Sequence, residues 1–279
     1  MKEFFKNNKK RILKILAVIA IIVIIPTVWY EIPVTEHITI SGEGKIDYPI
    51  RFALVTDLHS CYYGKNQSQL IKMIDKEKPD AILMSGDIFD DRLGPKNAQI
   101  FIEGVADRYP CFYVTGNHEF WSKKEDEVKE FLKSKGVTVL EGNARDININ
   151  GNDIDICGVD DPTYMAESKW LERLDGADKD SDPEKYRILL SHRPEKVEAY
   201  EKYEFELILC GHAHGGQWRI PFTKRGVAAP NQGLFPAYVD GLYDLDNGSE
   251  MIVSRGLARE RMPYPRFFNH PEVVIIDIG

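Results

Sequence analysis

Five short motifs of the sequence are rich in aspartate, histidine and asparagine, residue types that bind divalent metal ions through oxygen and nitrogen. They lie at residues 56–59 (TDLH), 85–90 (SGDIFD), 115–119 (TGNHE), 191–192 (SH) and 211–216 (GHAHGG). Five of the seven histidines of the chain fall inside these motifs. The last motif is the most specific one, because two imidazoles placed two residues apart among glycines can face neighbouring ions from an extended loop.

The ligand types limit which metals such a site would take. Aspartate, asparagine and histidine without a thiolate suit borderline or hard divalent ions such as Mn, Fe, Zn or Ni. The motifs hold more ligands than one tetrahedral ion can use, so the sequence predicts a site for two ions. Two ions about 3.5–4 Å apart can hold one phosphoryl group and lower the pKa of a water between them. Asp87 suits the bridging position, because each of its two carboxylate oxygens can bind one ion.

Apolar runs precede the motifs and predict buried β-strands. The clearest runs lie at 51–56, 81–84, 111–115, 154–159, 187–190, 207–210 and 273–278. Residues 69–78, 97–108 and 125–135 carry apolar side chains at helical spacing. The alternation of strands and helices predicts an α/β fold. Because ligands of open α/β sheets bind beyond the carboxyl ends of the strands, we expect the five motifs to meet at one edge.

The motif order D-x-H, G-D-x-x-D, G-N-H-E, H and G-H-x-H resembles that of the calcineurin-like metallophosphoesterase superfamily over residues 48–279. The sequences GHAHGGQWRIP, SRGL and RFFNHPE look like its bacterial membrane-associated branch, often named after UDP-diacylglucosamine hydrolases and a related phosphodiesterase. The resemblance implies a four-layer α/β/β/α sandwich of two mixed sheets. It also implies a first metal bound by Asp57, His59, Asp87 and His214, and a second bound by Asp87, Asn117, His192 and His212.

The same resemblance implies that His118 is not a metal ligand. It would contact the substrate phosphate together with Asn117 and protonate the leaving oxygen, with Asp90 orienting its ring. The residues alone also suit His118 to general acid work near neutral pH, but they leave a third metal ligand as the alternative. Among the arginines that follow the last motif, Arg255 is the candidate for a contact with the phosphate.

The formal net charge of −8 is the sum of two very different parts. Residues 1–14 hold six of the 36 basic residues and one of the 44 acidic ones, which makes their net charge +5. Residues 15–30 carry no charge, so residues 31–279 carry a net charge of −13. The uncharged run is rich in isoleucine and ends in Trp29 and Tyr30, as expected of a membrane span with an interfacial anchor. The acidic remainder argues against a nucleic-acid partner.

We therefore predict a basic tail and a transmembrane signal anchor at 1–30, a connecting stretch at 31–47 and a catalytic domain at 48–279. The positive-inside rule places the N-terminus in the cytoplasm and the catalytic domain outside the cell membrane. A cleaved signal peptide is the alternative, although no small-x-small cleavage site follows the apolar run. The four cysteines are dispersed and form no C-x-x-C motif.

A stretch rich in glycine, proline and aromatic residues, 217–243, follows the paired histidines. Its large apolar side chains either pack against the second sheet or form a wall for a lipid-linked substrate; they are Trp218, Phe222, Leu234, Phe235 and Tyr238.

The sequence thus predicts a membrane-anchored, two-metal phosphoesterase that hydrolyses a phosphodiester or pyrophosphate bond, with a lipid-linked or nucleotide-sugar substrate as one option. A phosphomonoesterase with a soluble substrate fits the same site. A catalytically silent metal-binding scaffold is the non-enzymatic alternative, although no motif position is missing. An amidohydrolase-like enzyme is disfavoured, because its H-x-H motif would follow the first strand and here follows a late one.

Overall fold

The computed structural model describes residues 9–15, 18, 30–42, 44–223, 225–259 and 265–279. The membrane span predicted at 15–30 therefore lies almost entirely outside the described residues. Within the described ranges, no helix is both long and apolar enough to cross a membrane.

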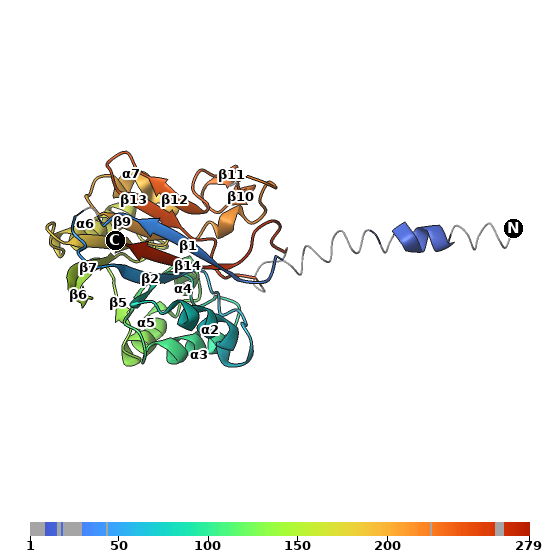
Figure 1. The fold of residues 1–279 in the computed structure, drawn as a ribbon, viewed down its shortest axis with the longest axis horizontal. Coiled ribbons are helices and arrows are strands. Elements are labelled where there is room, and N and C mark those ends of the chain that lie inside the picture. Colours follow the sequence, from blue (N-terminus) through green and yellow to red (C-terminus); the bar gives the residue numbers. More distant parts are fainter. Residues whose placement is uncertain (1–8, 16–17, 19–29, 43, 224, 260–264) are drawn as a thin grey trace.

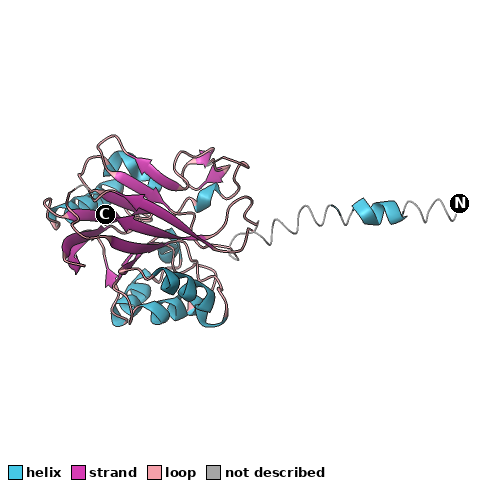
Figure 2. Ribbon diagram, in the orientation of Figure 1, coloured by secondary structure: helices cyan, strands magenta, loops and turns pink. Residues whose placement is uncertain are grey.

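Two six-stranded mixed sheets form the centre of the domain (Figures 1 and 2). The first sheet has the order β1 (Val34–Ile40), β14 (Glu272–Ile278), β2 (Ile50–Val55), β3 (Ala81–Ser85), β4 (Cys111–Val114) and β5 (Thr138–Val139). The second sheet has the order β12 (Gly241–Asp244), β13 (Glu250–Val253), β9 (Leu207–Cys210), β8 (Tyr186–Leu190), β7 (Asn152–Gly158) and β6 (Asn143–Ile149). A short antiparallel pair, β10 (Ala228–Ala229) and β11 (Gly233–Leu234), stands apart from both.

Helices cover the outer face of each sheet (Figure 2). On the first sheet these are α2 (Ser68–Glu77), α3 (Lys96–Val105) and α5 (Glu125–Ser134). On the second they are α6 (Glu167–Lys179) and α7 (Val197–Tyr200). The short α4 (Asn117–Trp121) follows β4 directly, and single turns of 3₁₀-helix lie at Lys65–Gln67, Pro194–Lys196 and His214–Gly216.

Three apolar clusters fill the spaces between these layers. Strand β2 shows why, because its successive side chains point to opposite faces. Phe52 and Leu54 join the cluster between the two sheets, whereas Ala53 and Val55 join the cluster under α2, α3 and α5. A third cluster, which includes Trp170, packs α6 and α7 on the second sheet. The prediction of an α/β fold built on two mixed sheets is confirmed.

One predicted boundary needs correction. The stretch 31–47 was expected to connect the membrane span to the domain, but it contains β1, which pairs in parallel with β14 over its whole length from Val34 to Ile40. The run VTEHITI is amphipathic and only half buried, as suits an edge strand, and it lacks the apolar run that marked the central strands. The first sheet therefore begins at residue 34.

The cluster between the sheets should carry much of the stability of the domain. Leu83 of β3 is fully buried there, so replacing it with alanine leaves a cavity. We expect Leu83→Ala to lower the free energy of unfolding by about 2–5 kcal/mol, measured by urea denaturation. Leu242→Ala is the matched control, because Leu242 lies on the edge strand β12 with 38% of its surface exposed. Equal losses from the two variants would contradict the packing described here.

Candidate metal centre

The five predicted motifs meet where the carboxyl ends of β2, β3 and β4 face those of β8 and β9. Backbone hydrogen bonds join the loops that carry them: the Asp57 amide donates to the Gly86 carbonyl at 3.0 Å, and the His59 amide to the Asp87 carbonyl at 2.9 Å. The seven side chains predicted to bind metal are all buried, and none is more than 6% exposed; they are Asp57, His59, Asp87, Asn117, His192, His212 and His214.

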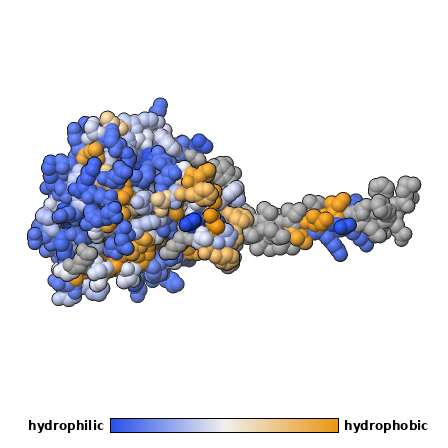
Figure 3. All heavy atoms as spheres, turned by 90° about the horizontal axis from the view of Figure 1, so that it is seen from above, coloured by the Kyte–Doolittle hydropathy of each residue, from blue (hydrophilic) through white to orange (hydrophobic). Residues whose placement is uncertain are grey.

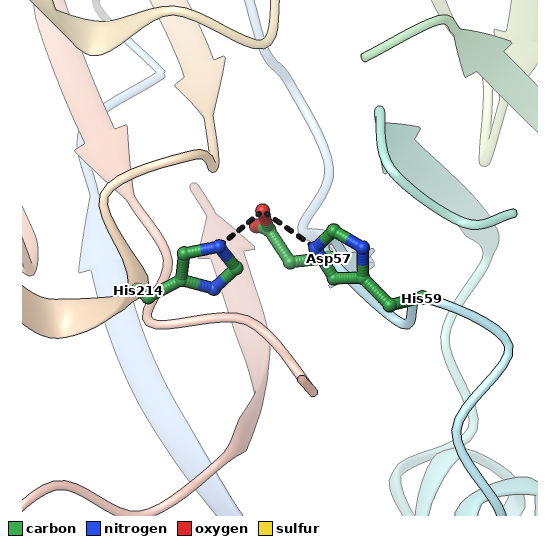
Figure 4. Close-up of side chains that lie close together, drawn as sticks. All are labelled: Asp57, His59 and His214. Carbon is green, nitrogen blue, oxygen red and sulfur yellow. Dashed lines mark ion pairs between the residues drawn. The ribbon is translucent and has the colours of Figure 1, made fainter. Parts of the chain in front are cut away.

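Six of these side chains form two groups, and within each group the candidate ligand atoms lie within 4.8 Å of one another. Figure 4 shows the first group, in which the rings of His59 and His214 point from separate loops toward the Asp57 carboxylate. Their Nε2 atoms lie 3.9 and 3.8 Å from Asp57 Oδ1. This spacing leaves room for an ion between the three side chains.

The second group contains Asp87, His192 and His212. Asp87 also reaches the first group, because its Oδ2 lies 3.1 Å from His192 Nε2 and 3.5 Å from His59 Nε2. The carboxylate of Asp87 therefore stands between the two groups, where the sequence predicted a bridging ligand.

Unpaired polar atoms at this site fit the binding of divalent cations. His59 Nε2, Asn117 Oδ1 and His214 Nδ1 are buried without a hydrogen bond, and Asp87 Oδ2 is buried in an ion pair with His192. A buried polar atom that lacks a partner costs about 1–3 kcal/mol. All four belong to residues predicted to bind metal, so the donor set and its unused atoms both suit metal ions.

Outer contacts fix the orientation of three imidazoles. His192 Nδ1 lies 2.8 Å from the Ser85 carbonyl, His59 Nδ1 lies 3.0 Å from Asp90 Oδ1, and His212 Nε2 lies 2.9 Å from Asn231 Oδ1. When each of these nitrogens donates its proton to the oxygen, the other nitrogen of the ring keeps a lone pair toward the centre of the site. Metal-binding histidines are commonly oriented in this way.

The electrostatics of the site reflect charges buried together. Burial raises the pKa of Asp57, whereas the charges of His192 and His59 outweigh burial and hold the pKa of Asp87 well below its usual range. Burial and the nearby charge of His192 lower the pKa of His212 to about 3. Burial also lowers the pKa of His214, so both rings are neutral, as metal ligation requires.

His192 differs from His212 and His214 in the direction of its pKa shift. Burial opposes its protonation, but the Asp87 carboxylate beside it raises its pKa to about 10. A proton on His192 compensates the carboxylates, and a divalent cation at the same place would take over that role.

Two carboxylates lie beside His118 Nδ1. Asp90, predicted to orient this ring, places its Oδ1 3.4 Å from His118 Nδ1, and the same oxygen hydrogen-bonds to His59 Nδ1 at 3.0 Å. The next residue, Asp91, hydrogen-bonds to His118 Nδ1 at 2.6 Å. The other ring nitrogen of His118 lies 3.9 Å from Asp87 Oδ2, at the edge of the metal centre.

Glu119, which follows His118, stabilises backbone around the metal centre. Its carboxylate accepts hydrogen bonds from the backbone amides of Gly116, Asp87 and Phe89, at 2.8 to 3.1 Å. Burial and the Asp87 charge raise its pKa to about 7. These hydrogen bonds from Glu119 stabilise the loop that carries Asp87.

Two arginines lie near the metal centre. Arg255, predicted to contact the phosphate, is paired with carboxylates: its Nε lies 2.6 Å from Glu272 Oε2 and 3.3 Å from Asp240 Oδ1. Its contact with the phosphate stays a prediction. Arg193 was missed, although it directly follows His192; it pairs with Asp161 and places a nitrogen 3.1 Å from His212 Nε2.

Glycines and strained backbone bring the ligands together. A Cβ atom on Gly116 would collide with the Asp87 carboxylate, and one on Gly211 would collide with that of Asp57. Five ligand residues have φ between 46° and 66°, in the left-handed region; they are Asp57, His59, Asp87, His212 and His214. Such conformations cost on the order of 1–3 kcal/mol each and concentrate at functional sites.

The stretch after the paired histidines is mostly exposed. Packing against the second sheet was one expectation for its apolar side chains, and Tyr238 does pack there. Phe222 and Leu234, in contrast, are 105% and 72% exposed, so this expectation is wrong for them. A cavity of about 410 Å³ lies between this stretch and the metal centre, and its lining includes His214, Gly216, Trp218, Val227 and Ala229.

Two mixed sheets thus carry a buried Asp/His centre that could hold metal ions at their common edge. The family model for calcineurin-like phosphoesterases matches residues 50–216, and the chain belongs to this family. It is 31% identical to a metallophosphoesterase of Aquifex aeolicus, over 82% of this chain and 85% of that one.

Other relatives differ more in length. The chain is 30% identical to the metallophosphoesterase Cj0846 of Campylobacter jejuni over 82% of its own length, but it spans only 59% of that protein. It is 30% identical to phosphodiesterase YaeI of Escherichia coli, over 63% of this chain and 64% of that one. The fold is similar to that of TT1561 of Thermus thermophilus, with a TM-score of 0.51 and 11% identity over 75% of this chain and 91% of that one.

A side chain at position 116 should displace the Asp87 carboxylate and so disrupt the metal centre. We expect Gly116→Ala to lose bound metal, measured by elemental analysis of the purified protein, because the added methyl group displaces the Asp87 carboxylate. Gly94→Ala is the matched control, since a Cβ atom there has no neighbour within 4 Å. The account would be wrong if both variants retained the metal content of the unmodified chain.

Proposed function

We propose that this chain is a two-metal phosphodiesterase, or a pyrophosphatase of the same mechanism, held at the outer side of a membrane by residues 15–30. The observation that carries the proposal is the pair of buried ligand groups, which Asp87 connects because its Oδ2 lies 3.1 Å from His192 Nε2 and 3.5 Å from His59 Nε2. The name of the Escherichia coli relative supports a phosphodiester as the substrate. The basic tail followed by an apolar run supports the anchor.

The ligand roles follow from the positions of the side chains. Asp57, His59 and His214 would hold one ion, His192, His212 and Asn117 the other, and Asp87 would bind both. When bound, two such ions supply Lewis acidity to the phosphoryl oxygens and a nucleophilic water at neutral pH; Mn, Fe, Zn and Ni all suit these donors. The buried carboxylates keep the ions in place, and the outer hydrogen bonds keep the imidazoles aimed at them.

His118 is the candidate general acid. Its Nδ1 is engaged by Asp91, which leaves Nε2 directed toward the metal centre. A proton held on Nε2 can pass to the leaving oxygen of the substrate, and Asp91 stabilises the ring in this orientation. Asn117 precedes His118 on the same short helix, and its buried Oδ1 has no hydrogen bond, which supports a contact with an ion and with the phosphate.

A lipid-linked substrate is the class that the surroundings of the site favour. The cavity beside His214 is lined by alanine, glycine, valine and tryptophan side chains and backbone, which suits an apolar group attached to the phosphate. The proposed anchor would keep the site close to such substrates. A soluble phosphomonoester remains the competing substrate, because the same centre can hold it.

Hydrolysis of bis-(p-nitrophenyl) phosphate by the purified full chain tests the proposal. We expect turnover with added Mn²⁺ and its loss after chelation, and we expect a higher kcat/KM than for p-nitrophenyl phosphate. A preference for the monoester would favour the phosphomonoesterase. Absence of turnover on both esters while metal stays bound would favour a silent scaffold.

Measuring the bound metal of single variants can separate the catalytic role of His118 from the metal-binding role of its neighbours. We expect His118→Ala and Asp91→Asn to keep bound metal, and we expect His118→Ala to lower kcat by about 10²–10⁴-fold on esters with poor leaving groups. Asp90→Asn should instead lose metal, because Asp90 orients His59. Loss of bound metal in His118→Ala, together with loss of turnover on nitrophenyl esters, would assign this ring to the metal instead.

A further inference from the structure

The surface beside the metal centre exposes large apolar side chains that no described part of the chain covers. We propose that this surface, defined by Trp218, Ile220, Phe222, Leu234, Phe235 and Phe268 and called the apolar face below, inserts into the headgroup region of a lipid bilayer. All six side chains are between 37% and 105% exposed. This contact is additional to the proposed anchor; its argument rests on the membrane anchoring in the proposed function, but it does not depend on the phosphoesterase reaction.

Backbone hydrogen bonds join the segments that carry the apolar face. The Val227 amide donates to the Trp218 carbonyl at 2.8 Å, and the Phe235 amide donates to the Val227 carbonyl at 2.9 Å. The amide of Arg219 donates to the Phe267 carbonyl at 2.9 Å, which brings Phe268 beside Trp218. Phe222 lies in the turn between Ile220 and Arg225, whose ends are joined by a backbone hydrogen bond of 3.0 Å.

The position of the apolar face identifies a bilayer as its occupant. The Tyr30 ring packs against Phe267 and Phe268, with ring centroids 6.1 and 5.1 Å apart. The chain that directly precedes Tyr30 is the uncharged apolar run of the sequence. Figure 1 shows β10 and β11 at the end of the domain where β1 begins, and apolar residues gather at that end in Figure 3.

The charges around the apolar face also support a lipid bilayer as its partner. Residues 217–237 contain Arg219, Lys224 and Arg225 and no acidic residue, although residues 31–279 as a whole carry a net charge of −13. Arg219 is paired with Asp240, whereas Arg225 is exposed beside Phe222. Aromatic side chains flanked by basic ones are the composition that binds the interface of a membrane with anionic lipids. A bilayer contact here would bring lipid headgroups to the cavity that borders His214.

The experiment places an environment-sensitive fluorophore on the full chain, in vesicles of phosphatidylcholine and phosphatidylglycerol. The four native cysteines are buried, so a thiol-reactive probe would label an introduced cysteine selectively. Phe222→Cys and Phe235→Cys place the probe on the apolar face, and Lys179→Cys, at the exposed end of α6, is the matched control. Circular dichroism and flotation with the vesicles establish that each variant is folded and bound.

We expect the probes at 222 and 235 to shift to shorter emission wavelengths and to lose most of their fluorescence to spin-labelled lipids. The probe at 179 should stay sensitive to aqueous iodide. If the chain floats with vesicles while all three probes remain aqueous, the anchor holds but the apolar face does not dock. A shift that depends on protein concentration and not on lipid would assign the face to a second copy and overturn the proposal. A chain that fails to float would contradict both the anchor and the face.

Discussion

Asp57 and Asp87 lie buried with five imidazoles around them, and a buried ion costs several kcal/mol unless other charges compensate it. Most local features of the site follow from this constraint. Glycines at 116 and 211 leave room for the two carboxylates, and the ligand residues adopt left-handed backbone conformations to aim their side chains inward. Bound divalent ions would supply the missing positive charge and satisfy the unpaired ligand atoms.

The same constraint explains why the fold needs two sheets. The first ligand group takes Asp57 and His59 from the loop after β2 and His214 from the loop after β9. The second takes Asp87 from the loop after β3 and its two histidines from the second sheet. Each group therefore draws on both sheets, and the apolar cluster between them sets the geometry of both groups at once. The contact of His192 Nδ1 with the Ser85 carbonyl links the sheets directly at the site.

The sequence was sufficient to predict the central strands and the grouping of the motif residues. Strands such as β3 are buried on both faces and appear as apolar runs, and glycine-flanked Asp and His at strand ends have no packing role. It was insufficient for β1, an edge strand with polar positions, and for the choice between Asp90 and Asp91, since adjacent aspartates differ only in where the folded loop directs them. The sequence also could not predict that Phe222 and Leu234 are exposed, because large apolar side chains occur both in a buried core and on a docking surface.

A crystal structure of the full chain grown with Mn²⁺, with anomalous scattering measured at the metal edge, tests the central claim most directly. The account predicts two anomalous peaks about 3.5–4 Å apart. One should lie among Asp57, His59 and His214, and the other among His192, His212 and Asn117, with the Asp87 carboxylate between the two. A single peak, or peaks bound by other residues with these side chains still unliganded, would contradict it.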